Sequence, residues 1–175
     1  MIASVPSARG AAGAALAPHR SSAGLRPGLV RAREGSGGVE SLATGARVLI
    51  VEDEYFVALD AEDALTDAGF RVVGVAATAE DALALARAER PDLVLMDIRL
   101  GGSRDGIEAA AEIRRELGIP SLFATAHADA ATRLRGEAAA SPLGWLSKPY
   151  TQAEVVAAVR LALAEARRRG PSGRG

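Results

Sequence analysis

Five short apolar runs recur along this chain, and they constrain its fold more than any other feature. Each run is five to seven residues long and is separated from the next by a longer segment. Strands that read as continuous apolar runs, rather than as alternating apolar and polar residues, are typical of a parallel sheet covered on both faces. The runs are RVLIV (47–51), RVVGVA (71–76), DLVLM (92–96), IPSLFAT (119–125) and PLGWL (142–146).

The segments between these runs have helical spacing and helix-start signals. Thr78 with Asp81 and Thr151 with Glu154 have the three-residue separation of a capping box, and Asp105 can cap a further helix. Strands that alternate with amphipathic helices predict five β-α units and a doubly wound α/β sheet with helices on both faces. The predicted helices cover residues 56–69, 78–89, 106–117, 128–140 and 151–168.

The composition excludes several classes of protein. The 175 residues are 49% hydrophobic and carry a formal net charge of −1, which suits one domain with a sizeable core. No run approaches the roughly 18 to 20 apolar residues of a membrane span. The chain has no cysteine, and His19 and His127 are too few for a histidine-rich metal site. We therefore expect a cytoplasmic protein that binds neither a membrane nor, given its charge, nucleic acid.

The N-terminal segment differs in composition from the rest of the chain. Residues 1–45 are rich in Ala, Gly, Arg, Ser and Pro without a sustained period, which predicts a disordered extension. Two other interpretations stay open: the segment is arginine-rich and acid-poor like a transit peptide, and translation could start downstream of it. Residues 46–168 are the predicted folded domain, and residues 169–175 a basic flexible tail.

Polar residues stand at the carboxyl ends of the predicted strands. Glu52 and Asp53 follow the first strand, Asp97 follows the third, Thr125 ends the fourth, and Lys148 comes soon after the fifth. Ligands of doubly wound sheets bind at this rim, so these side chains are expected to converge. Adjacent carboxylates repel unless a cation neutralises them, and oxygen ligands favour Mg²⁺. A lysine and a hydroxyl opposite the acids complete a cradle for a phosphoryl group, with Asp97 as its nucleophile.

Lys148 is the single lysine among 21 basic residues. Genomic bias favours arginine in such a chain. The two side chains differ in shape, because arginine ends in a planar guanidinium group whereas lysine carries a compact, point-like charge. The pattern therefore indicates that position 148 requires a compact ammonium group.

Four motifs together resemble the receiver domain of two-component response regulators. They are "LIVEDE", "LVLMDIRL", "FATAH" and "SKPY", in this order, and the resemblance covers residues 46 to 166. It implies a flavodoxin-like fold with strand order 2-1-3-4-5. It also implies a stand-alone phosphoacceptor signalling module, which is not an enzyme beyond its own phosphorylation and dephosphorylation.

The resemblance also implies roles for individual residues. Asp97 would be the phosphoacceptor and would bind Mg²⁺ with Asp53, with Glu52 acting through water and Arg99 through its backbone carbonyl. Thr125 and Lys148 would contact the phosphoryl oxygens, and Thr125 and Trp145 would form the switch. Trp145 departs from the Tyr or Phe that is common there, and Glu52 replaces an Asp. The peptide bond between Lys148 and Pro149 is often cis in this family.

The implied partners are a histidine kinase or phosphotransfer protein as donor, and a downstream protein or a second copy of the chain as target. The target would bind the face formed by the fourth helix, fifth strand and fifth helix. That face carries Arg133, Arg135 and Arg160 among many alanines, which predicts an adaptable surface without bulky apolar anchors.

Three alternative functions fit the sequence less well. An aspartate-nucleophile phosphatase usually has a second acid two residues after the nucleophile, where this chain has Arg99. A nucleotide-binding domain would have glycines after the first strand, where "EDEYF" stands. A receiver-like scaffold that is never phosphorylated would not need the acceptor, the acidic pair and the lysine together.

Overall fold

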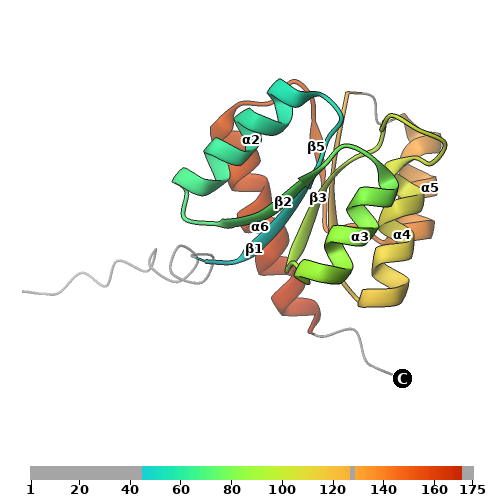
Figure 1. Ribbon diagram of the computed structural model, residues 1–175. Coiled ribbons are helices and arrows are strands. Elements are labelled where there is room, and N and C mark those ends of the chain that lie inside the picture. Colours follow the sequence, from blue (N-terminus) through green and yellow to red (C-terminus); the bar gives the residue numbers. More distant parts are fainter. Residues whose placement is uncertain (1–44, 127–128, 171–175) are drawn as a thin grey trace, which may run out of the picture. The chain divides into compact units, whose positions relative to one another are not determined.

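The computed structural model describes residues 45–126 and 129–170, and within them five parallel strands form one sheet flanked by five helices (Figure 1). The sheet order β2-β1-β3-β4-β5 confirms the predicted doubly wound α/β fold. The strands are β1 (Arg47–Val51), β2 (Arg71–Ala76), β3 (Leu93–Asp97), β4 (Ser121–Thr125) and β5 (Trp145–Ser147). The helices are α2 (Tyr55–Asp67), α3 (Ala79–Glu89), α4 (Gly106–Leu117), α5 (Ala130–Ala140) and α6 (Gln152–Arg169).

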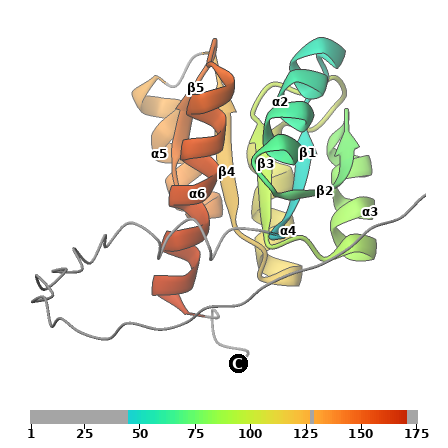
Figure 2. The same cartoon turned by 90° about the vertical axis from the view of Figure 1, so that its left-hand side faces the viewer.

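The helices form a layer on each face of the sheet (Figures 1 and 2). Helices α2 and α6 cover one face, and α3, α4 and α5 cover the other. In the central strand β3, Leu93 and Leu95 pack toward the first layer, whereas Val94 and Met96 pack toward the second. All five residues of β3 are buried, so the uninterrupted apolar run in the sequence reflects a strand with no solvent-facing side.

Side-chain caps begin four of the five described helices. Thr151 and Glu154 form a complete capping box at α6: the Glu154 amide donates to Thr151 Oγ1 over 3.3 Å, and the Thr151 amide donates to Glu154 Oε2 over 2.7 Å. A second capping box begins α4, and single side-chain caps begin α3 and α5. The predicted starts at Thr78, Asp105 and Thr151 are therefore confirmed.

Strands β4 and β5 begin later than predicted, and a proline precedes the start of each. Strand β4 begins at Ser121 rather than at residue 119, and β5 covers Trp145–Ser147 rather than 142–146. Pro120 and Pro142 have no N–H to donate to a ladder. Both segments still lie against their neighbours, since the Val94 amide donates to the Pro120 carbonyl over 3.0 Å and the Leu143 amide donates to the Ser121 carbonyl over 2.8 Å.

Strand β3 is shifted by one residue from its predicted range. Asp92 was expected to begin the strand, but its carboxylate accepts a hydrogen bond from the Arg47 amide over 2.7 Å and the strand starts at Leu93. Asp97 is the last residue of the strand and pairs with Ala124 of β4. The Asp97 side chain is thus positioned by the sheet itself and not by a loop.

Some predictions concern residues outside the described ranges. These are the disordered extension over residues 1–45, apart from Gly45, and the end of the basic tail after Gly170. Arg169, which was assigned to that tail, instead belongs to α6 and donates to Glu165 over 2.8 Å. None of the helices in the described part of the chain combines the length and the apolar character that a membrane crossing requires.

We expect Thr151→Ala to lower the free energy of unfolding by about 1 kcal/mol, because the first turn of α6 loses its capping hydrogen bond. Urea denaturation measures the change. Thr66→Ala is the matched control, since Thr66 is exposed in the last turn of α2. Equal losses in the two variants would show that the capping box does not stabilise the fold.

Candidate functional site

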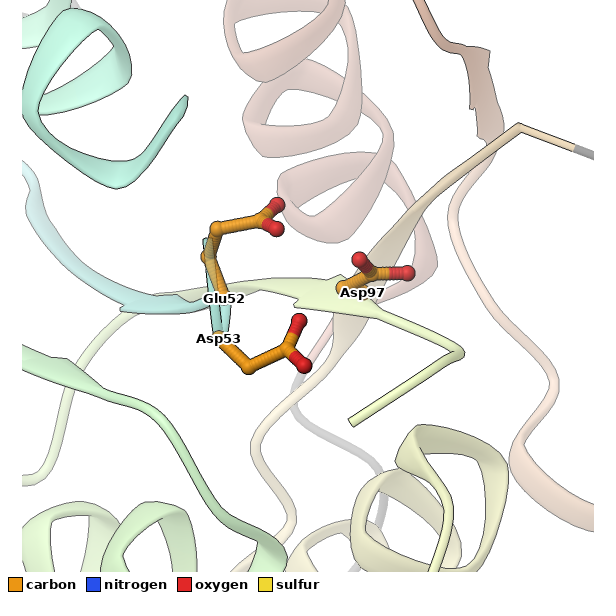
Figure 3. Close-up of side chains that lie close together, drawn as sticks. All are labelled: Glu52, Asp53 and Asp97. Atoms are coloured by element: carbon orange, nitrogen blue, oxygen red, sulfur yellow. The ribbon is translucent and has the colours of Figure 1, made fainter. Parts of the chain in front are cut away.

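Three carboxylates gather where β1 and β3 end (Figure 3). One oxygen from each of Glu52, Asp53 and Asp97 lies within 4.8 Å of the others. Glu52 is 4% exposed and Asp97 is 6% exposed, whereas Asp53 is exposed. The two neighbouring side chains point to opposite sides of the strand end (Figure 3), because Glu52 continues the side of β1 that packs toward α2 and α6, and Asp53 points the other way.

Lys148 lies between the two buried carboxylates. Its ammonium group donates to Asp97 Oδ2 over 2.6 Å and also to Glu52 Oε2, and its side chain is 12% exposed. The Lys148 amide donates to the Thr125 carbonyl over 2.9 Å, which aligns the residue with the end of β4. The next peptide bond, to Pro149, is cis, as the family resemblance implied.

Burial and charge act against each other at this site. Burial raises the pKa of Glu52, and the negative charge of Asp97 raises it further, while the hydrogen bond from Lys148 lowers it only in part. Burial lowers the pKa of Lys148, but its hydrogen bonds to Asp97 and Glu52 outweigh burial and raise the pKa overall. The site therefore holds one ammonium group against more than one carboxylate and retains negative charge that a cation can neutralise.

The carboxylates fit a magnesium ion. Each offers a hard oxygen ligand, and the exposed Asp53 leaves the cluster open on one side. Arg99, which the resemblance implied as a further ligand, lies two residues after the end of β3, and its amide donates to Asp97 Oδ1 over 3.0 Å. Gly101 is also close, since a Cβ there would lie 3.7 Å from Asp53 Oδ2.

The two ends of the loop after Asp97 contact each other through backbone atoms. A Cβ placed on Gly106 would overlap the backbone carbonyl oxygen of Asp97, so only glycine allows the start of α4 to pack there. The Gly106 amide donates to the Ile98 carbonyl over 2.9 Å and closes the loop. The sequence pattern predicted Gly106 as the first residue of this helix but did not predict its contact with the Asp97 backbone; its position directly after the capping Asp105 was the available signal.

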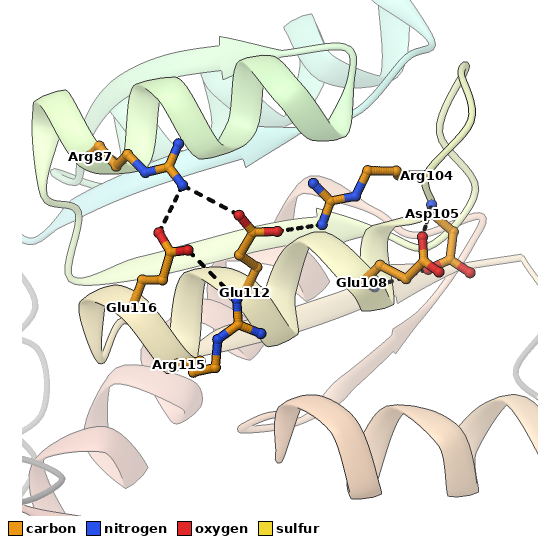
Figure 4. A network of polar contacts seen from close by, with 7 residues as sticks. All are labelled: Arg87, Arg104, Asp105, Glu108, Glu112, Arg115 and Glu116. Carbon is orange, nitrogen blue, oxygen red and sulfur yellow. Dashed lines mark hydrogen bonds and ion pairs between the residues drawn. The ribbon is translucent and has the colours of Figure 1, made fainter.

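Ion pairs connect this loop with the neighbouring helices (Figure 4). Arg104 donates to Glu112 of α4 over 2.5 Å, and the same glutamate accepts from Arg87 of α3 over 3.3 Å. The hydrogen bond from Arg104 lowers the pKa of Glu112. Asp105 pairs with Arg135 of α5. Exposed pairs of this kind stabilise little individually, but together they join the loop after Asp97 to three helices.

The two residues predicted to form a switch lie on adjacent strands. Thr125 is buried at the end of β4, and Trp145 begins β5 with its ring 4.9 Å from that of Phe123. The Trp145 indole N–H donates to Glu137 Oε1 over 2.8 Å, and the Arg133 guanidinium lies 5.2 Å from the ring centre. Sequence reasoning missed Glu137, although a partly buried indole N–H requires an acceptor.

Gly136 allows this position of Trp145. A Cβ at Gly136 would lie 2.7 Å from Cη2 of the indole, closer than real side-chain contacts.

The prediction that the face formed by α5, β5 and α6 has no bulky apolar anchors was wrong, because Leu134 on α5 and Leu161 on α6 are 72% and 71% exposed. His127, after Thr125, lies outside the described residues.

Comparison with known proteins assigns the family. The family model described as the response regulator receiver domain matches residues 48–160, which contain the acidic cluster, Thr125 and Lys148. The chain belongs to the response regulator receiver family. As a receiver domain, it is a phosphoacceptor signalling module of two-component systems.

Two relatives of this receiver domain are named as regulators. The transcriptional regulatory protein PdtaR of Mycobacterium tuberculosis is 35% identical over 127 residues, which are 71% of this chain and 60% of PdtaR. The phyllosphere-induced regulator PhyR of Methylorubrum extorquens is 35% identical over 66% of this chain and 43% of its own length. The chain thus spans about three fifths of the first relative and less than half of the second.

Solved structures agree with this assignment. The receiver domain of the NarL regulator from Mycobacterium tuberculosis superposes with a TM-score of 0.63 and 32% identity, covering 71% of this chain and 98% of that one. The response regulator PhyR from Brucella abortus has a TM-score of 0.65 and 36% identity, covering 75% of this chain and 53% of that one.

We expect Lys148→Met to lower the free energy of unfolding by about 3 kcal/mol at neutral pH, because Glu52 and Asp97 lose the cation that compensates their buried charges. The loss should shrink as the pH falls. Without Lys148 the pKa of Glu52 rises further above its unfolded value, so proton uptake favours the folded variant. Urea titrations from pH 8 to pH 5 measure this dependence.

The double variant Glu52→Gln with Lys148→Met is the matched control. It removes one charge of each sign and should recover part of the lost stability at neutral pH. A pH-independent loss in Lys148→Met would contradict a charge-based role for this lysine.

Proposed function

We propose that Asp97 accepts a phosphoryl group from the phosphohistidine of a histidine kinase or phosphotransfer protein, or from a small phosphodonor. The observation that carries this proposal is the contact of one partly buried ammonium group, that of Lys148, with both Asp97 and Glu52 inside a three-carboxylate cluster. If Asp97 had only a structural role, a lysine paired with Asp97 alone would neutralise its charge; here the same lysine also contacts Glu52. The chain acts as a regulator whose only chemistry is its own phosphorylation and dephosphorylation.

The proposed magnesium ligands are the carboxylates of Asp53 and Asp97, the backbone carbonyl of Arg99, and Glu52 through a water molecule. The exposure of Asp53 and the burial of Glu52 support this division between direct and water-mediated ligands. When bound, Mg²⁺ offsets the charge of the carboxylates and of the phosphoryl oxygens.

The remaining residues position the phosphoryl group. Lys148 holds the Asp97 carboxylate through Oδ2, and the Arg99 amide holds it through Oδ1, so both oxygens are oriented before a donor arrives. An ammonium group and a hydroxyl, those of Lys148 and Thr125, would then stabilise the charge of the transferred group. Because the carboxylate is already oriented, less entropy is lost when the transition state of phosphoryl transfer forms.

Phosphorylation would alter the face formed by α5, β5 and α6. The phosphoryl group adds close to two negative charges at Asp97, which can attract Thr125 and Lys148 and open space beside β4 for Trp145. Because Trp145 contacts α5 through Glu137, a movement of the indole would change the surface of that helix. We propose that a separate protein or a second copy of the chain binds this face.

We expect incubation with acetyl phosphate and Mg²⁺ to add the mass of one phosphoryl group to the intact chain, and Asp97→Asn to abolish the addition. Intact-mass spectrometry measures it. Asp92→Asn is the matched control, since Asp92 is an exposed carboxylate beside the opposite end of the same strand. Persistence of the label in Asp97→Asn would sink the assignment of the acceptor.

We expect beryllofluoride, a stable mimic of the phosphoryl group, to change amide hydrogen exchange in α5, β5 and the first turns of α6. The Arg135–Asp105 pair and the Glu137–Trp145 hydrogen bond connect α5 with the site. Exchange in α3, which no such contact joins to Trp145 among the described residues, serves as the internal control. Changes restricted to the loops after Asp53 and Asp97 would contradict the proposed route to the partner.

A further inference from the structure

Helix α5 contacts the indole of Trp145 through three residues on one of its faces. The Glu137 carboxylate accepts a hydrogen bond from the indole N–H over 2.8 Å, and the Arg133 guanidinium lies 5.2 Å from the ring centre. Gly136 leaves room for the ring, since a Cβ there would lie 2.7 Å from Cη2. Positions that lie three and four residues apart share a face of a helix. We call Arg133, Gly136 and Glu137 the α5 latch.

The α5 latch depends on a tryptophan at position 145. The indole N–H is a hydrogen-bond donor, and phenylalanine has none. Among aromatic side chains, the indole face also attracts a cation most strongly. Trp145, the only tryptophan in the chain, departs from the Tyr or Phe that is common at this position in the family. This departure therefore has a matching acceptor on the adjacent helix, Glu137.

The latch contacts belong to the arrangement of the domain without a phosphoryl group, which we call the resting arrangement. In it the indole also packs against Phe123 of β4, with 4.9 Å between the ring centres. In the proposed switch, Thr125 moves toward the phosphoryl group and the indole moves into the space that opens beside β4. A movement of the indole alone breaks its hydrogen bond to Glu137.

A movement of the whole helix with the indole has a cost at another contact. Arg135, which lies on α5 between the latch residues, pairs with Asp105 at the start of α4. If α5 moves together with Trp145, the hydrogen bond to Glu137 persists but the Arg135–Asp105 pair is disturbed. The contacts of α5 therefore stabilise the resting arrangement against either movement.

We propose that Glu137 is a positioning residue that holds Trp145 in the resting arrangement and thereby weakens the binding of a phosphoryl group at Asp97, with Arg133 assisting. A ligand shifts an equilibrium between two arrangements only by its difference in affinity for them, and a contact made only in the resting arrangement opposes that shift. This inference rests on the proposed phosphorylation of Asp97 and adds the residues that limit how readily the switch responds.

The test measures the apparent dissociation constant of beryllofluoride for the full chain with Mg²⁺, by isothermal titration calorimetry. Glu137→Ala should lower this constant by about five-fold, because the resting arrangement loses a hydrogen bond to a charged acceptor. Glu137→Gln keeps an acceptor oxygen for the indole N–H and should stay within about two-fold of the native chain. A pure effect of charge would instead change both variants equally.

Arg133→Gln further separates contact from charge. Glu137→Ala removes a negative charge and Arg133→Gln removes a positive one, so simple attraction of the anionic ligand would change the two affinities in opposite directions. Loss of the latch predicts tighter binding in both variants, by about two-fold in Arg133→Gln, because the cation over the ring is lost.

Trp145→Phe is the matched background. It removes the N–H donor and keeps an aromatic ring, so Glu137→Ala should have no further effect on beryllofluoride binding in it. A general effect of Glu137 on the stability of α5 would persist there. In the chain that retains Trp145, indole fluorescence is a second readout, and Glu137→Ala without ligand should shift the emission in the direction that beryllofluoride shifts the native chain.

The outcomes separate this inference from the proposed function. An apparent dissociation constant that is unchanged or higher in Glu137→Ala overturns the latch, as do equal changes in Glu137→Gln, opposite changes in Arg133→Gln, or an effect that persists in Trp145→Phe. Beryllofluoride that binds Asp97→Asn as tightly as the native chain overturns the proposed function instead. Tighter binding in Glu137→Ala and Arg133→Gln, together with loss of binding in Asp97→Asn, supports both.

Discussion

The contact of the Lys148 ammonium group with the buried carboxylates of Glu52 and Asp97 is the interaction on which the site depends. A parallel sheet brings the carboxyl ends of its strands to one rim, and in this chain the rim collects three acids within 4.8 Å. Such a cluster destabilises the fold unless cations offset it. Lys148 neutralises part of the charge, and the carboxylates that remain could hold a metal ion.

The surroundings of Asp97 explain how chemistry at the rim can reach a distant surface. Gly106 packs against the Asp97 backbone, and the adjacent Asp105 pairs with Arg135 of α5. The same helix holds the indole of Trp145 through Glu137. The loop after Asp97 and the indole of Trp145 therefore contact one common helix, α5. In the proposed switch, two arrangements of that helix would suffice to couple the loop and the indole by about 1 to 3 kcal/mol.

Most of the fold could be predicted from the chain, because local chemistry and the tertiary arrangement agree. The continuous apolar run before Asp97 corresponds to the central strand, and the predicted caps at Asp105 and Thr151 both form. Errors appeared where a segment lies against the sheet without regular pairing, as beside Pro120 and Pro142. Apolar composition indicates that such a segment is buried, but regular pairing with the neighbouring strand also needs backbone N–H groups, and proline has none.

The sequence by itself determined the order of the elements, the family, and the set of polar residues at the strand ends, because strand periodicity and capping act over a few neighbouring residues. Only the tertiary structure decided that Glu52 is buried while Asp53 is exposed, and that Lys148 contacts two carboxylates rather than one. It also placed Phe56 and Tyr150 on one cavity, although 94 positions separate them in the chain. Contacts of this kind depend on how helices and strand ends pack in three dimensions, and no local pattern of residues specifies that packing.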